Sequence, residues 1–222
     1  KYRTLIHVIT LVPMYALAAV FLRFAVIPSV LLFSVVTDWA LTKGWFWHAL
    51  SLGFCLAFGY FLYGFTLIFV IAAANRLIVG KIEASRGQFY SANFVRWYAH
   101  NGLTYIVRYT FLEFVTPTPI SQLFYRMMGM KIGENVQINS TAISDPSMIE
   151  LEDKVTVGGS ATIVAHYGQA GYLVISPVRV RKGATIGLRA IVMGGADIGE
   201  NAKILPNSVV MPKTVIPAGE TW

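Results

Sequence analysis

The stretch 184–210, ATIGLRAIVMGGADIGENAKILPNSVV, carries a branched aliphatic residue at every sixth position. These positions are Ile186, Val192, Ile198, Ile204 and Val210. An α-helix repeats at about 3.6 residues and a β-strand at about 2 residues, so neither element alone produces this spacing. A fixed period that is repeated many times is typical of a solenoid.

The period extends on both sides of this stretch. Val174, Val180 and Ile216 keep the same step, and positions four residues later are mostly small, as at Ala184 and Ala190. Upstream, the step returns at Ile132, Ile138, Leu151, Val157 and Ile163. β-Branched residues favour extended backbone, and the Gly, Asn, Asp and Pro residues between them favour corners. We therefore expect three hexapeptides to close one triangular coil, with the aliphatic side chains stacked inside it.

Individual hexapeptides resemble a known repeat. The units IGENVQ (132–137), IGLRAI (186–191) and IGENAK (198–203) are similar to the [Leu/Ile/Val]-Gly-x-x-small-x unit of the hexapeptide-repeat acyltransferases. The resemblance covers about residues 131–222. It implies an all-β left-handed parallel β-helix, an acyltransferase-like domain; the left hand comes from the resemblance, since the period alone does not fix it.

The beginning of the chain has a different composition. Hydrophobic residues make up 55% of the 222 residues, and between Thr4 and Ala74 the charged residues are Arg23, Asp38 and Lys43. This composition is typical of transmembrane helices. We therefore expect a transmembrane helical hairpin over residues 1–80, ahead of the β-helix.

Residues 49–74 contain no charged side chain and predict one spanning helix. Basic residues flank the apolar region at both ends, at Lys1, Arg3, Arg76, Lys81 and Arg86. Because basic residues collect on the cytoplasmic side of a membrane, we expect two crossings, with both ends and the β-helix in the cytoplasm. The segment 37–48, TDWALTKGWFWH, is then the external interfacial loop.

The segment 4–36 allows two interpretations. It is longer than the roughly 20 helical residues that cross a hydrocarbon core of about 30 Å. Pro13, Arg23 and Pro28 interrupt it. Either one helix is kinked and partly emergent, or a span near 5–22 is followed by a short re-entrant piece.

An aromatic linker over residues 81–130 joins the two parts. Residues 86–125 carry eleven aromatic side chains and predict one or two amphipathic helices at the membrane surface. His7, His48 and His100 are also expected to lie at the membrane interface. The prolines of TPTP (116–119) end these helices.

Several function classes are disfavoured. The net charge of +7 reflects basic residues beside apolar segments, so we expect a membrane-lipid partner and no nucleic acid. Cys55 is the single cysteine, so no disulfide framework or metal-ligand spacing is present in the sequence, and no metal is expected. His7, His48 and His100 do not begin an HxxxxD motif, which disfavours a glycerolipid-type acyltransferase.

The repeat breaks twice, and insertions in a solenoid usually map to its binding face. From Ile138 to Leu151 there are 13 residues where two steps need 12, so one extra residue lies in SDPSMIE. From Ile163 to Val174 there are 11 residues where one step needs six, which predicts a five-residue loop in AHYGQAGYL.

Both breaks fall on one face of the predicted coil. Units three apart stack about 4.8 Å from one another, as in any parallel sheet. Counting at this step puts the units that begin at 144, 163, 186 and 204 in one column. We therefore expect Asp145 one coil below His166 and Arg189 one coil above it.

This arrangement suits acyl transfer. A neutral imidazole takes a proton from an attacking amine or hydroxyl near pH 7, and a carboxylate orients the ring. The resemblance implies the same role, because hexapeptide acyltransferases place one histidine at a loop in a cleft between two subunits of a trimer, along which the pantetheine arm lies. His166 matches that histidine. Its acidic partner is Asp145, with Glu150 or Glu152 as alternatives.

Other residues are candidates for binding the substrate or the acyl donor, namely Asn139, Glu150, Tyr167, Arg181, Lys182 and Arg189. Arg179 and Lys203, with Arg181 and Lys182, either receive the phosphates of a carrier or form a solvated basic face. Asn139 and Asp145 also suit plain corner roles, the latter because it precedes Pro146.

The whole arrangement resembles one repeat of the membrane-bound terminal region of ε-poly-lysine synthetase-like nonribosomal peptide synthetases. That region joins activated amino acids into isopeptides, which implies that this chain is an excerpt of a longer protein or a stand-alone homologue. One hypothesis is a membrane-anchored acyltransferase that uses acyl-CoA or a phosphopantetheine-linked donor as a homotrimer or intramolecular pseudo-trimer. The other is a non-catalytic scaffold or a degenerate member of a pseudo-trimer. The loop at His166 favours the enzyme.

Overall fold

The computed structural model describes residues 2–89 and 91–222, with the side chains of residues 12–89 and 91–222. The chain divides into two compact units, Lys1–Ala74 and Asn75–Trp222. The first unit holds the apolar helices, and the second holds the aromatic segment and the repeats.

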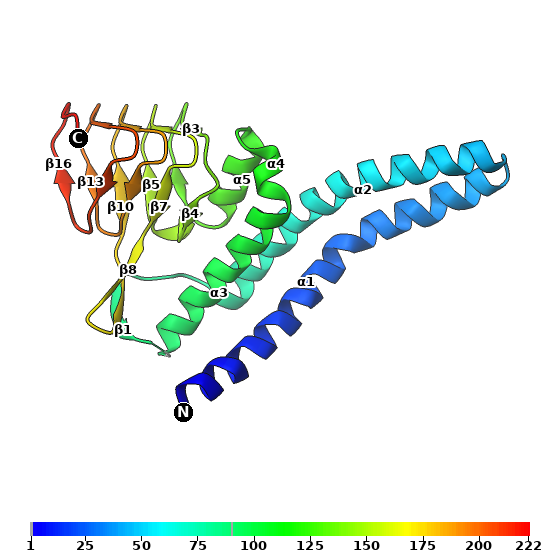
Figure 1. Ribbon diagram of the computed structural model, residues 1–222, viewed down its shortest axis with the longest axis horizontal. Helices are drawn as coiled ribbons and strands as arrows, with labels where there is room; N and C mark the ends of the chain where they lie inside the picture. Colours follow the sequence, from blue (N-terminus) through cyan, green and yellow to red (C-terminus); the bar gives the residue numbers. More distant parts are fainter. Residues whose placement is uncertain (1, 90) are drawn as a thin grey trace. The chain divides into compact units, whose positions relative to one another are not determined.

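The first unit is a pair of long helices joined by a short turn (Figure 1). Helix α1 spans Tyr2–Leu41 and helix α2 spans Trp45–Ala74. The Oγ of Ser29 donates a hydrogen bond of 2.7 Å to the carbonyl of Gly59 and ties the two helices together. Two stretches, Val12–Leu41 and Trp45–Val79, are long and apolar enough to cross a membrane, by length and composition.

Two predictions for this unit need correction. Helix α1 continues through Pro13 and Pro28, so the re-entrant alternative is wrong; a helix accommodates a proline at the loss of one backbone hydrogen bond. The loop predicted over 37–48 is wrong for most of its length, because only residues 42–44 lie outside the helices. Gly44, at a φ of +98°, provides the break that the residues before it do not.

The second unit contains a parallel β-helix. Its strands form three sheets with the orders β16-β13-β10-β5-β2, β14-β11-β6-β3 and β15-β12-β7-β4. The strands are β2 (Lys131–Ile132), β3 (Gln137–Ile138), β4 (Ile143–Ser144), β5 (Ile149–Leu151), β6 (Thr156–Val157), β7 (Thr162–Val164), β10 (Val178–Val180), β11 (Thr185–Ile186), β12 (Ile191–Val192), β13 (Asp197–Ile198), β14 (Lys203–Ile204), β15 (Val209–Val210) and β16 (Val215–Ile216). Consecutive strands of the coil belong to different sheets, so the chain visits each sheet once per coil (Figure 1).

The six-residue period has the physical origin that the sequence predicts. Ile186 pairs with Val157 on one side and with Ile204 on the other, and all three are buried. Corner residues such as Asn201 and Asn207 adopt positive φ values of 55° and 61°, which asparagine tolerates better than most residues. The predicted fold class, long apolar helices followed by a hexapeptide β-helix, is confirmed.

The second break is larger than predicted. The inner positions that flank it are Ile163 and Val180, which are 17 residues apart (163 to 180), where one step takes six. Val174 matches the six-residue period, but it pairs with Arg86 and Tyr167 outside the coil. The five-residue loop is therefore wrong: Val174 lies six residues before Val180 by coincidence, while its strand belongs to a separate antiparallel sheet.

That separate sheet is a three-stranded extension with the order β1-β9-β8. Strands β8 (His166–Gln169) and β9 (Tyr172–Ile175) form a hairpin, and β1 (Ser85–Gln88) adds to it from the aromatic segment. The sequence of β1, SRGQ, lacks alternating apolar residues, so it does not predict a strand; the strand is defined by its pairing with β9.

The larger insertion also shifts the column that was predicted. Arg189 does not lie above His166; its N–H donates to the carbonyl of Gly159 at 3.0 Å, at another corner. In the next coil, the residue that lies beside the backbone of His166 is Gly194 and not Arg189. A Cβ added at Gly194 would lie 3.1 Å from the His166 backbone nitrogen. The predicted position of Asp145 one coil below His166 is correct, because Ile143 of β4 pairs with Ile163 of β7.

The aromatic segment folds into short helices that belong to the second unit. They are η1 (Asn75–Val79), α3 (Ala92–Val107), η2 (Arg108–Leu112), α4 (Glu113–Val115) and α5 (Pro119–Met127), with the turn η3 (Pro146–Met148) inside the β-helix. Ser91 caps α3 by accepting from the N–H of Phe94 at 3.3 Å. The prediction that His100 lies at an interface is wrong: it is completely buried within this unit.

Candidate active site

Asp145 follows strand β4 at the first break of the repeat and is completely buried. Its φ is +60°, a left-handed conformation that aspartate adopts more readily than most residues. Pro146 then starts the turn η3. A buried carboxylate is costly unless it is fully hydrogen-bonded, so its partners decide what it does.

Hydrogen-bond donors surround both carboxylate oxygens of Asp145. Oδ1 accepts from Trp97 Nε1 at 2.6 Å and from Asn101 Nδ2 at 2.6 Å. Oδ2 accepts from the backbone N–H of Ala165 at 3.0 Å and lies 2.6 Å from Nδ1 of His166. The backbone N–H of Asp145 donates to Asn101 Oδ1 at 3.1 Å, so the residue is held through its main chain as well.

These contacts keep the carboxylate ionised. Burial alone would raise the pKa of Asp145. The hydrogen bond and charge of His166, followed by the hydrogen bonds from Asn101 and Trp97, outweigh burial and hold the pKa below its usual value. Near pH 7 the group is therefore a fixed negative charge beside the imidazole.

His166 starts strand β8 at the base of the hairpin, with 24% of its side chain exposed. An ionised carboxylate can only accept, so in the neutral imidazole Nδ1 carries the proton that faces Asp145 and Nε2 carries the lone pair. The ring of Trp97 lies 4.8 Å from the imidazole, centroid to centroid, at 70°. This imidazole has the tautomer and the partial exposure that a general base requires.

His100 lies close to the same carboxylate but is sealed from solvent. Its Nδ1 lies 2.7 Å from Asn75 Oδ1, and its Nε2 lies 3.4 Å from Ser147 Oγ. Burial lowers the pKa of His100 to about 4, against the opposing charge of Asp145. His100 is therefore neutral near pH 7.

The two alternative carboxylates lie elsewhere. Glu150 forms ion pairs with Lys131 at 3.3 Å and with Arg179 at 3.6 Å. Glu152 accepts the backbone N–H of Lys182 at 3.0 Å. No recorded contact joins either carboxylate to His166 in the described part of the chain, whereas Asp145 contacts it directly.

The remaining predicted residues are dispersed. Arg181 donates two hydrogen bonds of 2.8 Å to Asp197, so its guanidinium is occupied. Tyr167 follows His166 but is buried on the opposite face of the hairpin, since side chains alternate along a strand. Asn139, Lys182, Arg189 and Lys203 are exposed.

Sequence reasoning missed Trp97 and Asn101, which lie 48 and 44 residues before Asp145. One signal was available. Trp97, Asn101 and Tyr105 follow one another at steps of four and so share one face of α3. A row of hydrogen-bonding groups along an aromatic helix needs partners, and here the β-helix supplies them.

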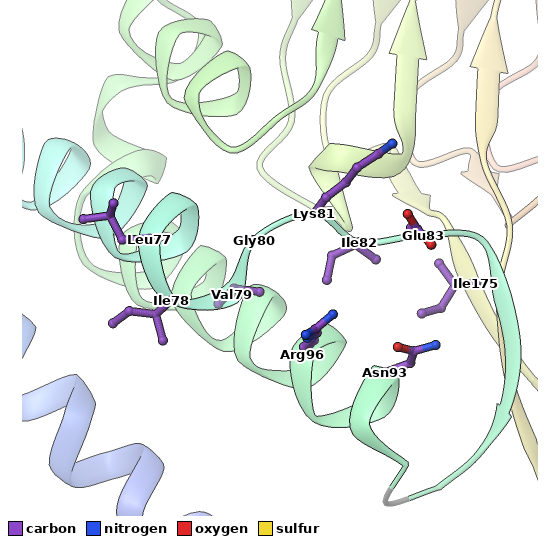
Figure 2. Close-up of a pocket in the computed structure, with 10 residues that line it drawn as sticks. All are labelled: Leu77, Ile78, Val79, Gly80, Lys81, Ile82, Glu83, Asn93, Arg96 and Ile175. Carbon is purple, nitrogen blue, oxygen red and sulfur yellow. The ribbon is translucent and has the colours of Figure 1, made fainter.

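A cavity of about 440 Å³ opens beside the hairpin (Figure 2). Residues 77–83, Asn93 and Arg96 of α3, and Ile175 of β9 line it. Ile175 is the partner of His166 in the hairpin, and directly opposed residues on antiparallel strands point to the same face. The cavity therefore reaches the face of the hairpin that carries His166. No group of three or more His, Cys, Asp or Glu within the described residues could hold a metal ion.

No family model matches the chain. The chain is 25% identical over 148 residues to a delta-poly-L-ornithine synthetase from Acinetobacter baumannii. This alignment covers 67% of the chain and 11% of that protein, so the chain spans about a tenth of the length of this curated relative.

The solved structures that are similar to the chain include two acetyltransferases. A hexapeptide-repeat containing acetyltransferase from Vibrio cholerae has a TM-score of 0.46 and 17% identity, covering 60% of this chain and 87% of that one. A maltose O-acetyltransferase from Clostridium difficile has a TM-score of 0.44 and 17% identity, covering 60% of this chain and 88% of that one. The match to the poly-ornithine synthetase agrees, at low identity, with the resemblance to poly-amino-acid synthetases drawn from the sequence.

Proposed function

We propose that this chain is part of a membrane-anchored acyltransferase. It transfers an acyl or aminoacyl group from a thioester, either acyl-CoA or a carrier-bound pantetheine, to an amine or hydroxyl. The observation that supports this most is the 2.6 Å contact between His166 Nδ1 and the buried, ionised Asp145. A solenoid that serves only as a scaffold needs neither this pair nor the insertion that carries it.

In this mechanism Nε2 of His166 removes the proton of the acceptor as the acceptor nitrogen or oxygen attacks the thioester carbonyl carbon. The carbon–sulfur bond then breaks, and the imidazolium returns the proton to the departing thiolate to give a thiol. Asp145 stays ionised and stabilises the imidazolium between these steps. A positioned general base typically contributes about 100- to 10,000-fold to the rate.

The cavity beside Ile175 is the place we assign to the acceptor. Arg96 lies on its α3 side, and within residues 2–89 and 91–222 no hydrogen bond or ion pair engages that guanidinium. A guanidinium suits bidentate recognition of a carboxylate. Figure 2 shows Arg96 and Asn93 on α3, with Ile82 and Glu83 across the cavity from them. An acceptor amine that also carries a carboxylate, as an amino acid does, fits this lining.

The acceptor class agrees with the name of the relative in Acinetobacter baumannii, a synthetase of poly-L-ornithine. Isopeptide formation in a poly-amino-acid synthetase is therefore the specific reaction we propose. Helices α1 and α2 anchor the domain as a two-crossing hairpin, with the β-helix in the cytoplasm. Three copies of the domain assemble, either as a homotrimer or within one longer chain.

The test is a transfer assay with the full-length protein purified in detergent. Acetyl-CoA, acetyl-pantetheine and L-ornithinyl-pantetheine are supplied as donors, with and without L-ornithine, and released thiol and product mass are measured. We expect thiol release that depends on the acceptor, together with an amide product. Folded protein that consumes none of these thioesters would support the scaffold hypothesis instead.

A further inference from the structure

We infer that Trp97 and Asn101 of helix α3 are positioning residues: they hold the Asp145 carboxylate in the orientation that aligns His166. The inference rests on the proposed function. Two of the four hydrogen-bond donors that hold the Asp145 carboxylate then come from α3, a helix outside the repeats.

The first observation is the division of donors between the two carboxylate oxygens. Trp97 and Asn101 occupy Oδ1 of Asp145 from the side of α3, both at 2.6 Å. Oδ2 is thereby left to the coil side, where Ala165 and His166 are its partners. A carboxylate held at both oxygens by fixed donors cannot rotate freely, so the donor pair on α3 fixes the plane in which the other oxygen faces His166.

The second observation is the reciprocal pairing of Asn101 with Asp145. The side-chain amide of Asn101 donates to Oδ1, and its oxygen accepts the backbone N–H of Asp145 at 3.1 Å. This pair fixes the carboxylate together with the left-handed backbone that presents it. Asn101 Nδ2 also donates to the carbonyl of Trp97 at 3.1 Å, which links the two positioning residues to each other.

The third observation concerns the burial of these groups. Asn101 is 5% exposed, and a buried amide is unfavourable unless its hydrogen bonds are made. Asparagine is also a poor helix former, so helix stability does not explain it at this position. Its contacts, other than the one to the Trp97 carbonyl, go to Asp145.

Trp97 has a second contact with the same site. Its indole N–H reaches Asp145, while its ring lies edge-on to the imidazole of His166 at 4.8 Å. One side chain therefore restrains both members of the pair. Tyr105, one turn beyond Asn101, provides a matched control, since its hydroxyl lies 3.0 Å from Ser144 Oγ, one residue before Asp145.

The experiment is a double-mutant cycle on the transfer reaction of the full-length protein. Asn101→Ala and Trp97→Phe are each measured alone and in an Asp145→Asn background, with Tyr105→Phe as the control. We expect each single variant to lower kcat by about 10- to 100-fold, the effect typical of residues that orient another ligand or base, with KM for the thioester unchanged. In the Asp145→Asn background the same changes should cost less than about twofold, because residues that act through one group are not additive.

Tyr105→Phe should stay within about twofold of the parent in both backgrounds. A loss from Asn101→Ala that is equally large with and without Asp145 would overturn the inference and leave a purely structural role. Wild-type kcat in Asn101→Ala and Trp97→Phe would overturn it as well. Trp97→Phe keeps the ring, so it remains informative if Asn101→Ala does not fold. Failure of the proposed function is distinguishable, since the parent protein itself then shows no acceptor-dependent release of thiol.

Discussion

His166 Nδ1 lies 2.6 Å from Asp145 Oδ2, although 21 residues separate them and each lies at a different break of the repeat. Strands β4 and β7, which precede them, pair directly, so stacking one coil on the next brings the two breaks together. The histidine is partly exposed and the aspartate is buried, which is the division expected of a base and the group that orients it.

Replacing His166 with alanine should lower the rate of acyl transfer by about 100- to 10,000-fold, because the proton of the acceptor loses its base. The coil should still form, since His166 lies outside the aliphatic core, but stability should fall because the buried Asp145 carboxylate loses one of its partners. Thiol release and size-exclusion profiles measure the two properties. Gln169→Ala, an exposed change on the same strand, is the matched control and should keep normal turnover. Wild-type turnover in His166→Ala would show that His166 is not the base of the reaction.

Asp145→Asn should lower the rate by a similar factor of about 100 to 10,000. The four groups that face the carboxylate are all donors, so an amide NH2 in its place meets either the pair from α3 or the pair that includes His166. Either orientation disturbs the alignment of the imidazole. A rate close to wild type in a folded Asp145→Asn protein would show that the carboxylate has no part in transfer.

His100 should make the second unit sensitive to acid between about pH 6.5 and pH 4. Its folded pKa of about 4 lies below the ordinary value of 6.5, so the unfolded chain binds a proton that the folded chain excludes. Stability is complete above about pH 6.5 and falls by about 3 kcal/mol as the pH decreases to about 4. The lowered pKa of Asp145 acts in the same direction, but only below its ordinary value of 3.8.

Thermal unfolding followed by tryptophan fluorescence across this pH range measures the effect. His100→Gln cannot titrate, so its stability should change less between pH 7 and pH 4.5 than that of the parent. Parallel pH curves for the two proteins would exclude His100 as the source.

Arg96→Ala should raise KM for a carboxylate-bearing acceptor by about 10- to 100-fold, the loss expected for one hydrogen-bonded charge pair. kcat should change little, because we assign Arg96 to binding the carboxylate of the acceptor and not to the proton transfer. Arg86→Ala is the matched control, since that arginine stacks on Tyr172 on the opposite face of the hairpin. If L-ornithine and its carboxamide show the same KM in the parent protein, Arg96 does not bind a carboxylate.

A two-crossing hairpin predicts that the turn at 42–44 faces outward and the β-helix faces the cytoplasm. In a Cys55→Ser background, Lys43→Cys should react with an impermeant maleimide in intact cells, whereas Glu200→Cys should react only after lysis. Labelling of Glu200→Cys in intact cells would reverse the proposed orientation.

The sequence by itself determined the β-helix, because each hexapeptide repeats the same local requirement for an aliphatic residue inside and a turn residue at the corner. It also placed Asp145 and His166 on one face, since both breaks fall there when the steps are counted, but it left Glu150 and Glu152 open as alternative partners of His166. The size of the hairpin could not be predicted from the sequence, because Val174 matches the six-residue period although its strand pairs with β1 and β8 outside the coil.

Only the tertiary structure decided that Trp97 and Asn101 reach Asp145 and that His100 is buried. The repeat period and the composition indicate the local structure of each segment, such as which side chains are buried and which backbone is extended. They do not show which of several polar surfaces meets the row of hydrogen-bonding side chains on α3. That choice depends on hydrogen bonds between residues more than 40 positions apart, which form only once the coil and the helix have both folded.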